Sequence, residues 1–150
     1  MRALIQKVSR AEVRVDSETV SQIGAGLLVF LGVEAADSPD DIDWLARKIA
    51  KMRLFTPTDN EKEQSVIDIG GQILVVSQFT LHASTKKGNR PSYIRAARPE
   101  QAEPLYEQMM AALDTYLPGR ISGGRFGAMM EVELINDGPL TIWMDTDRKD

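Results

Sequence analysis

The stretch ILVVSQFTLHAS, residues 73–84, places polar side chains inside an apolar run. Four apolar residues lead without a break into Ser77, Gln78 and Thr80. A buried polar group without a hydrogen-bond partner costs roughly 1–3 kcal/mol, so these groups need partners. Two interpretations stay open. Either the side chains bond locally at a solvated strand end, or the strand end is a pocket wall. In a pocket, hydroxyls and backbone N–H groups could stabilise an oxyanion, and Thr80 could attack or orient water.

Few other residue patterns in the chain suggest chemistry. The sequence has no cysteine and a single histidine, His82, which excludes thiolate and multi-histidine metal sites, and we expect no metal and no cofactor. A Ser–His–Asp triad would have to recruit His82, which we expect to be incidental. No Walker or GxGxxG sequence occurs. No good base is adjacent to Thr80, which weakens its case as a nucleophile.

A second unusual segment is LINDGPLT, residues 134–141. Asn-Asp-Gly is good turn chemistry and Pro139 can open an edge strand, so the residues alone predict a hairpin here. A Gly-Pro bond is cis in only about 5–6% of cases, so the sequence by itself does not predict a cis bond between Gly138 and Pro139.

The net charge of −4 provides no global positive field for nucleic acid. The densest basic cluster is KKGNR, with Lys86, Lys87 and Arg90, which is either a solvated loop or a local binding patch. No apolar run approaches the roughly 20 residues of a membrane span, and the N-terminus lacks a signal-peptide core. We therefore expect a cytoplasmic protein with no membrane partner and no DNA partner.

Periodicity predicts the elements that position these residues. An α+β domain over residues 1–150 is expected, in the order strands, helix, strand, helix, strands. The clearest helix is SPDDIDWLARKIAKMRLF, residues 38–55, capped by Ser38. TPTDNEKEQS, residues 56–65, is expected to be an exposed loop. A second helix is expected over Pro99–Leu117. Besides the strand in 73–84, the predicted strands are 2–8, 11–15, Val20–Ile23, Leu27–Val33, Met129–Ile135 and Leu140–Met144.

Taken together, the two polar segments resemble the D-aminoacyl-tRNA deacylases, which hydrolyse D-amino acids from tRNA. The resemblance rests on SQFTL at 77–81 and NDGPLT at 136–141, with GGQILVV, KKGNRPSY and GRFGAMMEVELI between or beside them. It covers nearly the whole chain. It implies a β-sheet or barrel-like core with two main helices, and a homodimer with active sites at the interface. The reaction would remove D-amino acids, or mischarged glycine, from the 3′-terminal adenosine and reject L-aminoacyl-tRNA.

The resemblance also implies roles for individual residues. Ser77, Gln78, Phe79 and Thr80 would line the pocket for the adenosine and its amino acid, which Phe126, Met130 and Ala102 help to shape. Gly138 and Pro139, joined by a cis bond, would reach into the partner's pocket and exclude L-amino acids. Lys86, Lys87 and Arg90 would bind acceptor-stem phosphates. Two mechanisms stand: attack by Thr80, or water activated by the tRNA 2′-hydroxyl with an oxyanion site near Phe79 and Thr80. The absence of a nearby base favours the second.

The chain departs from the family pattern at several positions. Lys7 stands where arginine is common, so the support of the Gly-Pro motif loses a planar fork. Met129 replaces a usual aspartate, Leu140 replaces valine, and the usual Lys-Met-Asn before GGQILVV is missing. Two rival functions remain to be weighed. One is a non-catalytic tRNA-binding accessory domain of the same fold, and the other is a small-molecule esterase that would need acid–base machinery beyond His82.

Overall fold

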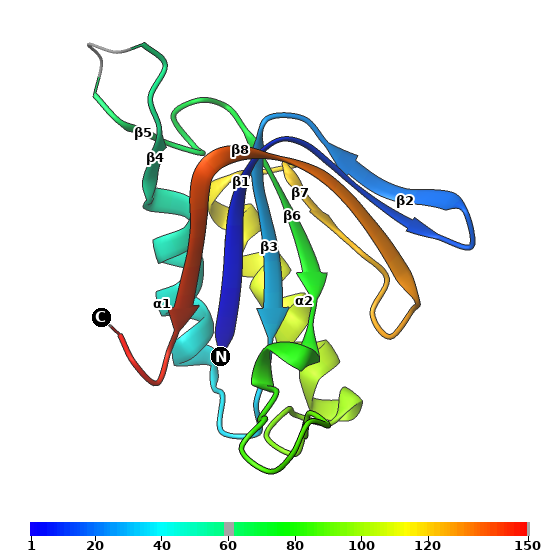
Figure 1. The fold of residues 1–150 in the computed structure, drawn as a ribbon. Helices are drawn as coiled ribbons and strands as arrows, with labels where there is room; N and C mark the ends of the chain where they lie inside the picture. The colour runs from blue at the N-terminus through cyan, green and yellow to red at the C-terminus, as the bar shows by residue number, and fades with distance from the viewer. Residues whose placement is uncertain (59–61, 150) are drawn as a thin grey trace.

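A mixed β-sheet, nearly closed into a barrel, carries both helices on one face (Figure 1). The structure, a computed structural model, describes residues 1–58 and 62–149. The elements are β1 (Arg2–Val15), β2 (Glu18–Ile23), β3 (Gly26–Gly32), α1 (Pro39–Lys51), β4 (Arg53–Phe55), β5 (Gln64–Ser65), β6 (Gln72–Ser77), the 3₁₀ turn η1 (Phe79–His82), α2 (Pro99–Tyr116), β7 (Ile121–Gly123) and β8 (Met130–Asp145). This agrees with the predicted α+β class.

The six-stranded sheet has the order β2-β1-β3-β6-β7, with β8 on the other edge of β1. β3 pairs with β6 in parallel, and β6 pairs with β7 in parallel, so the carboxyl ends of these strands meet at one edge. β4 and β5 form a separate two-stranded ribbon. Of the predicted loop at 56–65, residues 59–61 lie outside the described residues, and Gln64–Ser65 form β5.

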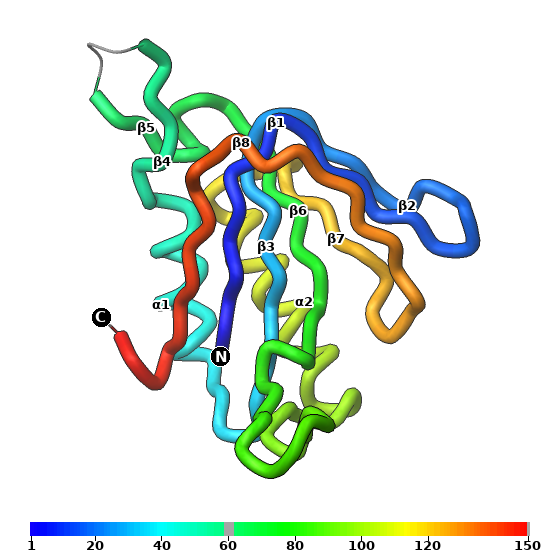
Figure 2. Tube along the Cα trace, in the orientation of Figure 1, coloured from blue at the N-terminus to red at the C-terminus, as the bar shows by residue number. Residues whose placement is uncertain are grey.

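β1 is one strand where the sequence predicted two. Its first half pairs with β3 and its second half with β2, while β8 follows it along both halves (Figure 2). The inward positions change phase between the halves, because Ala3 and Ile5 face one apolar cluster whereas Val8 and Ala11 face another. The phase change, accompanied by register shifts near Val8, explains why the pattern reads as two strands.

Each face of the bent sheet carries its own cluster of buried apolar side chains. The larger lies between the sheet and the helices and includes Leu27, Leu45, Ile73 and Met109. The smaller lies under the curved half, around Val13, Leu28 and Leu74. None of the helices in the described part of the chain combines the length and apolar character that crossing a bilayer requires.

The first helix is shorter than the pattern of residues 38–55 predicts. It starts after Ser38, as predicted, and the Ser38 N–H donates to Asp41 Oδ2 at 2.9 Å. It ends at Lys51, because Met52 adopts an extended backbone, with φ −59° and ψ 130°. Arg53–Phe55 then form β4, whose Phe55 side chain is buried.

The hairpin predicted at NDGP is wrong. Residues 130–145 form a single strand, β8, and NDGP lies in an outward bulge within it. Gln6 pairs with Thr141 and Val8 pairs with Asn136, so two steps along β1 correspond to five along β8. The bulge is fastened by Asn136, whose Nδ2 donates to the carbonyl oxygens of Lys7 at 2.9 Å and Leu140 at 3.1 Å. Turn residues therefore serve here to project the segment out of the sheet.

Candidate functional site

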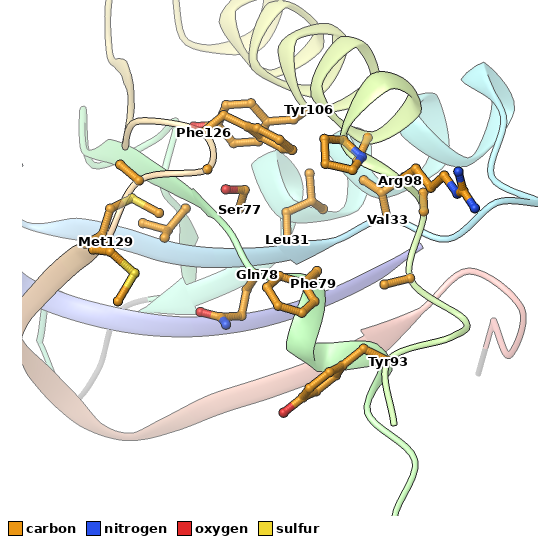
Figure 3. A pocket seen from close by; sticks show the side chains of 18 of the residues that line it. Leu31, Val33, Ser77, Gln78, Phe79, Tyr93, Arg98, Tyr106, Phe126 and Met129 are labelled. Carbon is orange, nitrogen blue, oxygen red and sulfur yellow. The ribbon is translucent and has the colours of Figure 1, made fainter. Parts of the chain in front are cut away.

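A cavity of about 610 Å³ opens where the carboxyl ends of β3 and β6 meet the start of α2 and the segment before β8 (Figure 3). Its walls are mainly apolar. Among the predicted residues, the walls include Ser77, Gln78, Phe79, Ala102, Phe126 and Met130. Residues separated by up to 101 positions in sequence, Leu31 and Val132, thus share one cavity.

The polar insertion marks the point where β6 ends. Ser77 is the last residue of the strand, and Gln78 turns the chain into η1, with φ −146° and ψ 81°. The strand end expected at this polar stretch therefore falls at Ser77. The Gln78 N–H continues the sheet by donating to the Leu31 carbonyl at 2.7 Å. Gln78 Nε2 donates to Thr80 Oγ1 at 2.5 Å. The side chains of Gln78 and Thr80 thus bond to each other, which agrees with the interpretation that the polar groups find partners locally.

The start of η1 leaves backbone donors free. Within residues 1–58 and 62–149, the N–H groups of Phe79 and Thr80 have no hydrogen-bond acceptor. The first N–H groups of a helical turn have no partner inside the turn. Two neighbouring N–H donors beside an apolar cavity form a site suited to a developing negative charge on oxygen, as in ester hydrolysis.

Aromatic side chains border these donors. The Phe79 ring is 56% exposed and meets Tyr93 edge-on, with ring centroids 5.2 Å apart and an interplanar angle of 77°. Tyr106 packs against Phe126 at 5.9 Å and donates its hydroxyl to the Val75 carbonyl at 2.8 Å. Burial raises the pKa of Tyr106 to about 12, so its hydroxyl stays protonated near neutral pH and cannot act as a base.

Thr80 has a different environment from an activated nucleophile. No carboxylate or imidazole in the described part of the chain hydrogen-bonds to Thr80 Oγ1. In the same described ranges, Thr80 does not line the cavity, although Gln78 and Phe79 do. Within the described ranges, the only hydrogen bond to the Thr80 side chain comes from the amide of Gln78. This geometry suits a role in orienting groups better than a role as attacking atom.

His82 is buried at the end of η1, with 1% of its side chain exposed. Contrary to expectation it has a carboxylate neighbour, because its Nδ1 lies 3.2 Å from Glu34 Oε2. Burial lowers the pKa of His82 below its ordinary value, and the Gly32 backbone and Glu34 only partly offset that effect. Its ring does not line the cavity formed by the described residues, so a triad through His82 has no geometric support.

The NDGP bulge lies away from the cavity of its own chain. Gly138 and Pro139 are exposed, the bond between them is cis, and neither lines the cavity within the described ranges. Lys7 Nζ lies 3.0 Å from Asp137 Oδ2, so the lysine contacts the bulge through one ion pair. A single chain does not bring the two sequence motifs together.

The basic residues Lys86, Lys87 and Arg90 are exposed on a loop next to η1. The loop is closed at its base by two hydrogen bonds between the backbones of Ser84 and Ser92, at 2.8 and 2.9 Å. Tyr93 follows this base and forms part of the cavity wall, so the loop stands beside the cavity mouth.

Among the described residues, no three carboxylate or imidazole side chains gather into a metal-binding group.

Several cavity residues were not predicted as site residues. They are Leu31, Val33, Val76, Tyr93, Arg98, Tyr106 and Met129, with their small neighbours. Leu31 and Val76 continue ordinary buried strands, and Tyr106 lies on an apolar helix face, so their local patterns indicate only a core. Met129 is 90% exposed, which is unusual for a methionine and marks the cavity rim as a surface to be covered.

Comparison with known proteins gives a consistent result. The model of the family described as D-Tyr-tRNA(Tyr) deacylase matches residues 4–145. A D-aminoacyl-tRNA deacylase of Akkermansia muciniphila is 53% identical over the full length of both chains. One from Chromobacterium violaceum is 53% identical over 146 residues, covering 97% of each chain.

Solved structures show the same fold. A protein described as c-Myc DNA Unwinding Element Binding Protein matches with a TM-score of 0.90 and 41% identity, covering 97% of this chain and 98% of its own. A probable eukaryotic D-amino acid tRNA deacylase matches with a TM-score of 0.82, over 95% of this chain and 97% of its own. Its identity of 16% supports a common fold alone.

Proposed function

The chain belongs to the D-Tyr-tRNA(Tyr) deacylase family, and from this premise we propose that the cavity at the end of β6 is its active site. The protein is a D-aminoacyl-tRNA deacylase, a hydrolase that acts in translation proofreading. The observation that carries the assignment of the site is the pair of N–H groups of Phe79 and Thr80, which have no acceptor among the described residues and lie beside an apolar cavity of about 610 Å³. Residues 1–150 act as one domain in this proposal, and the cytoplasm, where charged tRNA is used, is its location.

The proposed reaction is attack of water on the ester carbonyl carbon. As the new C–O bond forms, the carbonyl oxygen gains negative charge and is held by the N–H groups of Phe79 and Thr80. The bond to the ribose oxygen of the terminal adenosine then breaks, which releases the free amino acid and a tRNA with its ribose hydroxyl restored. The ribose 2′-hydroxyl activates the water, since among the described residues no base hydrogen-bonds to Thr80 and His82 does not line the cavity.

The adenosine is proposed to occupy the apolar part of the cavity. Ala102, Phe126 and Met130 line that part, and the rings of Phe126 and Tyr106 provide aromatic surface for a base. Ser77 and Gln78 face the ester end, where their polar groups meet the substrate.

Chirality is proposed to come from a second copy of the chain. Gly138 and Pro139 project from the sheet in a fastened bulge that is too far around the molecule to line its own cavity. Large apolar side chains are exposed near the cavity, with Ile94 92% and Met129 90% exposed, which favours a homodimer that covers them. In that dimer the bulge of one protomer would close the other's cavity and exclude the side chain of an L-amino acid, whereas D-amino acids and glycine would fit.

Hydrolysis of two different esters tests this function against a small-molecule esterase. D-Tyr-tRNA is expected to be hydrolysed rapidly in the presence of EDTA, whereas D-tyrosine methyl ester, which has no 2′-hydroxyl and no adenosine, is expected to react at the rate seen without protein. Equal turnover of both esters would favour the general esterase. Tight binding of D-Tyr-tRNA without turnover would favour the non-catalytic accessory domain.

Thr80→Val distinguishes the two mechanisms. Removal of the hydroxyl is expected to slow D-Tyr-tRNA hydrolysis by no more than about 10-fold, because the N–H group of Thr80 remains. A nucleophilic Thr80 would instead make the loss about 10⁴-fold or larger. The measurement is the single-turnover rate, with Thr80→Ser as the control that keeps a hydroxyl.

The loop closed by Ser84 and Ser92 is proposed to bind acceptor-stem phosphates. Replacement of Lys86, Lys87 and Arg90 together by alanine is expected to reduce the slope of log affinity for tRNA against log salt by about 2–3. The matched control replaces Arg47, Lys48 and Lys51 on the exposed face of α1, which removes the same charge elsewhere. Equal slopes for the two triple variants would show that the loop is only solvated.

The name of the 41% identical solved relative refers to binding of a DNA element. The family and the curated relatives are named for tRNA, and the densest basic cluster of the sequence, Lys86, Lys87 and Arg90, lies on the loop beside the cavity. We therefore take the aminoacylated end of tRNA as the nucleic-acid partner.

A further inference from the structure

The 3₁₀ turn η1 is anchored at its far end by Arg2. The Leu81 carbonyl of η1 accepts a hydrogen bond from Arg2 Nη1 at 3.0 Å. Arg2 is oriented by Asp145, whose Oδ2 accepts from Arg2 Nε at 3.0 Å. The last carbonyls of a helical turn have no partner inside the turn, so Arg2 supplies one to Leu81. The strand pair β1–β8, which carries Arg2 and Asp145, thereby fixes the end of η1.

A second charged group holds the same turn through His82. The His82 ring contacts Glu34 at 3.2 Å, and both Glu34 oxygens accept from Arg95 Nη2, at 3.2 and 3.0 Å. Glu34 is 8% exposed and Arg95 is about half exposed. Burial favours the neutral acid of Glu34, but the hydrogen bonds and charge of Arg95 outweigh that effect and hold the pKa of Glu34 below its usual value. Glu34 is therefore a carboxylate near neutral pH.

This group connects three walls of the cavity. Glu34 follows the end of β3, His82 ends η1, and Arg95 lies in the segment between Tyr93 and Arg98. Backbone contacts join two of these segments, since Ala97 N–H donates to the Val33 carbonyl at 2.9 Å. η1 also packs closely on β3, because a side-chain carbon added at Gly32 would lie 3.0 Å from both the Gln78 carbonyl oxygen and the His82 ring. A shift of any one segment would move the others.

A buried ion pair is weak evidence for stability, because desolvation offsets most of the attraction between its charges. Apolar side chains of similar size would stabilise this end of the fold about as well. What charged groups add is directed geometry: Arg2 fixes the Leu81 carbonyl through a hydrogen bond of defined length, whereas Glu34 meets the His82 ring in a 3.2 Å contact that is not a hydrogen bond. The contacts of Arg2 and Glu34 converge on Leu81 and His82, one to three residues after the proposed oxyanion donors.

We propose that Arg2 and Glu34 are positioning residues that hold η1, and with it the N–H groups of Phe79 and Thr80, in the geometry needed for ester hydrolysis. This inference rests on the proposed function of the cavity. The two side chains reach η1 from different elements, Arg2 from the β1–β8 pair and Glu34 from the end of β3. Among the described residues that line the cavity, neither Arg2 nor Glu34 occurs, so each side chain acts through η1.

The test compares Arg2→Met and Glu34→Gln with two matched controls. Arg14→Met and Glu133→Gln remove the same charges from an ion pair of 2.9 Å on β1 and β8 that does not contact η1 among the described residues. Arg95→Met is included because that side chain is half exposed, so its loss is expected to leave the fold intact. For each protein we would measure kcat and KM for D-Tyr-tRNA, the melting temperature, and amide hydrogen exchange of peptides covering residues 77–83, α1 and α2.

The expected result is a 10- to 100-fold lower kcat for Arg2→Met and Glu34→Gln, with KM close to that of the unchanged protein, since a displacement of about 1 Å can cost 10²-fold. Exchange should quicken over residues 77–83 and stay unchanged in α1 and α2. Arg95→Met should lower kcat and quicken exchange over residues 77–83 by smaller amounts than Arg2→Met and Glu34→Gln. The two controls should change neither kcat nor exchange.

Three outcomes would overturn the inference. An unchanged kcat in both Arg2→Met and Glu34→Gln would overturn the inference, whether or not hydrogen exchange over residues 77–83 becomes faster. The proposed function would stand in that case. A lower kcat accompanied by faster exchange in α1 and α2 would indicate general destabilisation. A complete lack of hydrolysis by the unchanged protein would overturn the proposed function first, and this inference with it, so the two failures are distinguishable.

Discussion

Phe79→Pro is expected to lower kcat for D-Tyr-tRNA hydrolysis by about 10²–10³-fold relative to Phe79→Ala, which corresponds to about 2.7–4 kcal/mol of transition-state stabilisation. Proline removes the backbone N–H at the first position of η1, and that position tolerates its fixed φ. Because both variants lose the ring that packs on Tyr93, the difference between them isolates the N–H. Single-turnover rates at saturating protein measure it.

The control for this comparison is the folded state of the two variants. Melting temperatures within a few degrees of each other would show that the turn survives the proline. Equal rates for Phe79→Pro and Phe79→Ala would contradict the oxyanion role of this N–H and would leave Thr80 as the only proposed donor. A slow Phe79→Ala together with an equally slow proline variant would assign the effect to the aromatic ring.

Ala102→Phe is expected to reduce kcat/KM for D-Tyr-tRNA by about 100-fold, mainly through KM. Ala102 lies in the first turn of α2, is 8% exposed, and lines the same cavity as Ser77 and Gln78. A phenyl ring there would fill space that we assign to the adenosine, so substrate would bind out of position. Steady-state kinetics over a range of tRNA concentrations separate KM from kcat.

Ala111→Phe is the matched control, because Ala111 lies on the same helix and is exposed. It makes the same chemical change without entering the cavity, and its kinetics should equal those of the unchanged protein. If Ala102→Phe kept its full kcat/KM while its melting temperature was also unchanged, the adenosine would have to bind elsewhere.

Local patterns predicted the helices and most strands, because burial of one face imposes a period that a single segment already contains. The second helix and the Ser38 start of the first helix agree with the structure to within a residue or so. The end of the first helix was overestimated, because Met52 and Phe55 continue an apolar pattern whether the backbone is helical or extended. The short strand β7 carries no pattern of its own.

The end of β6 at SQFT and the error at NDGP have a common cause. At both places the backbone conformation is decided by contacts with distant segments. Gln78 leaves the strand while its N–H still bonds to Leu31, and the NDGP bulge exists because Asn136 and Thr141 must pair with Val8 and Gln6. Turn residues have the same local chemistry in a hairpin and in a bulge, so only the pairing of the whole strand distinguishes the two.

The candidate site was predicted in part. The polar residues of SQFT stood out because they interrupt an apolar strand, and family resemblance pointed to Ala102, Phe126 and Met130. Leu31, Tyr93 and Tyr106 could not be found that way, since each is ordinary in its own segment and becomes a wall only when β3, α2 and the loop after η1 meet. The anchoring of η1 by Arg2 and Glu34 likewise joins residues far apart in sequence.

The most direct test of the account is hydrolysis of D-Tyr-tRNA and L-Tyr-tRNA measured side by side, with the same tRNA and protein concentration. Rapid loss of the D-ester is expected, while the L-ester should decay at the rate seen without protein. Loss of both esters at similar rates would contradict chiral exclusion by Gly138 and Pro139. Persistence of both esters would contradict the assignment of the cavity at the end of β6 as an active site.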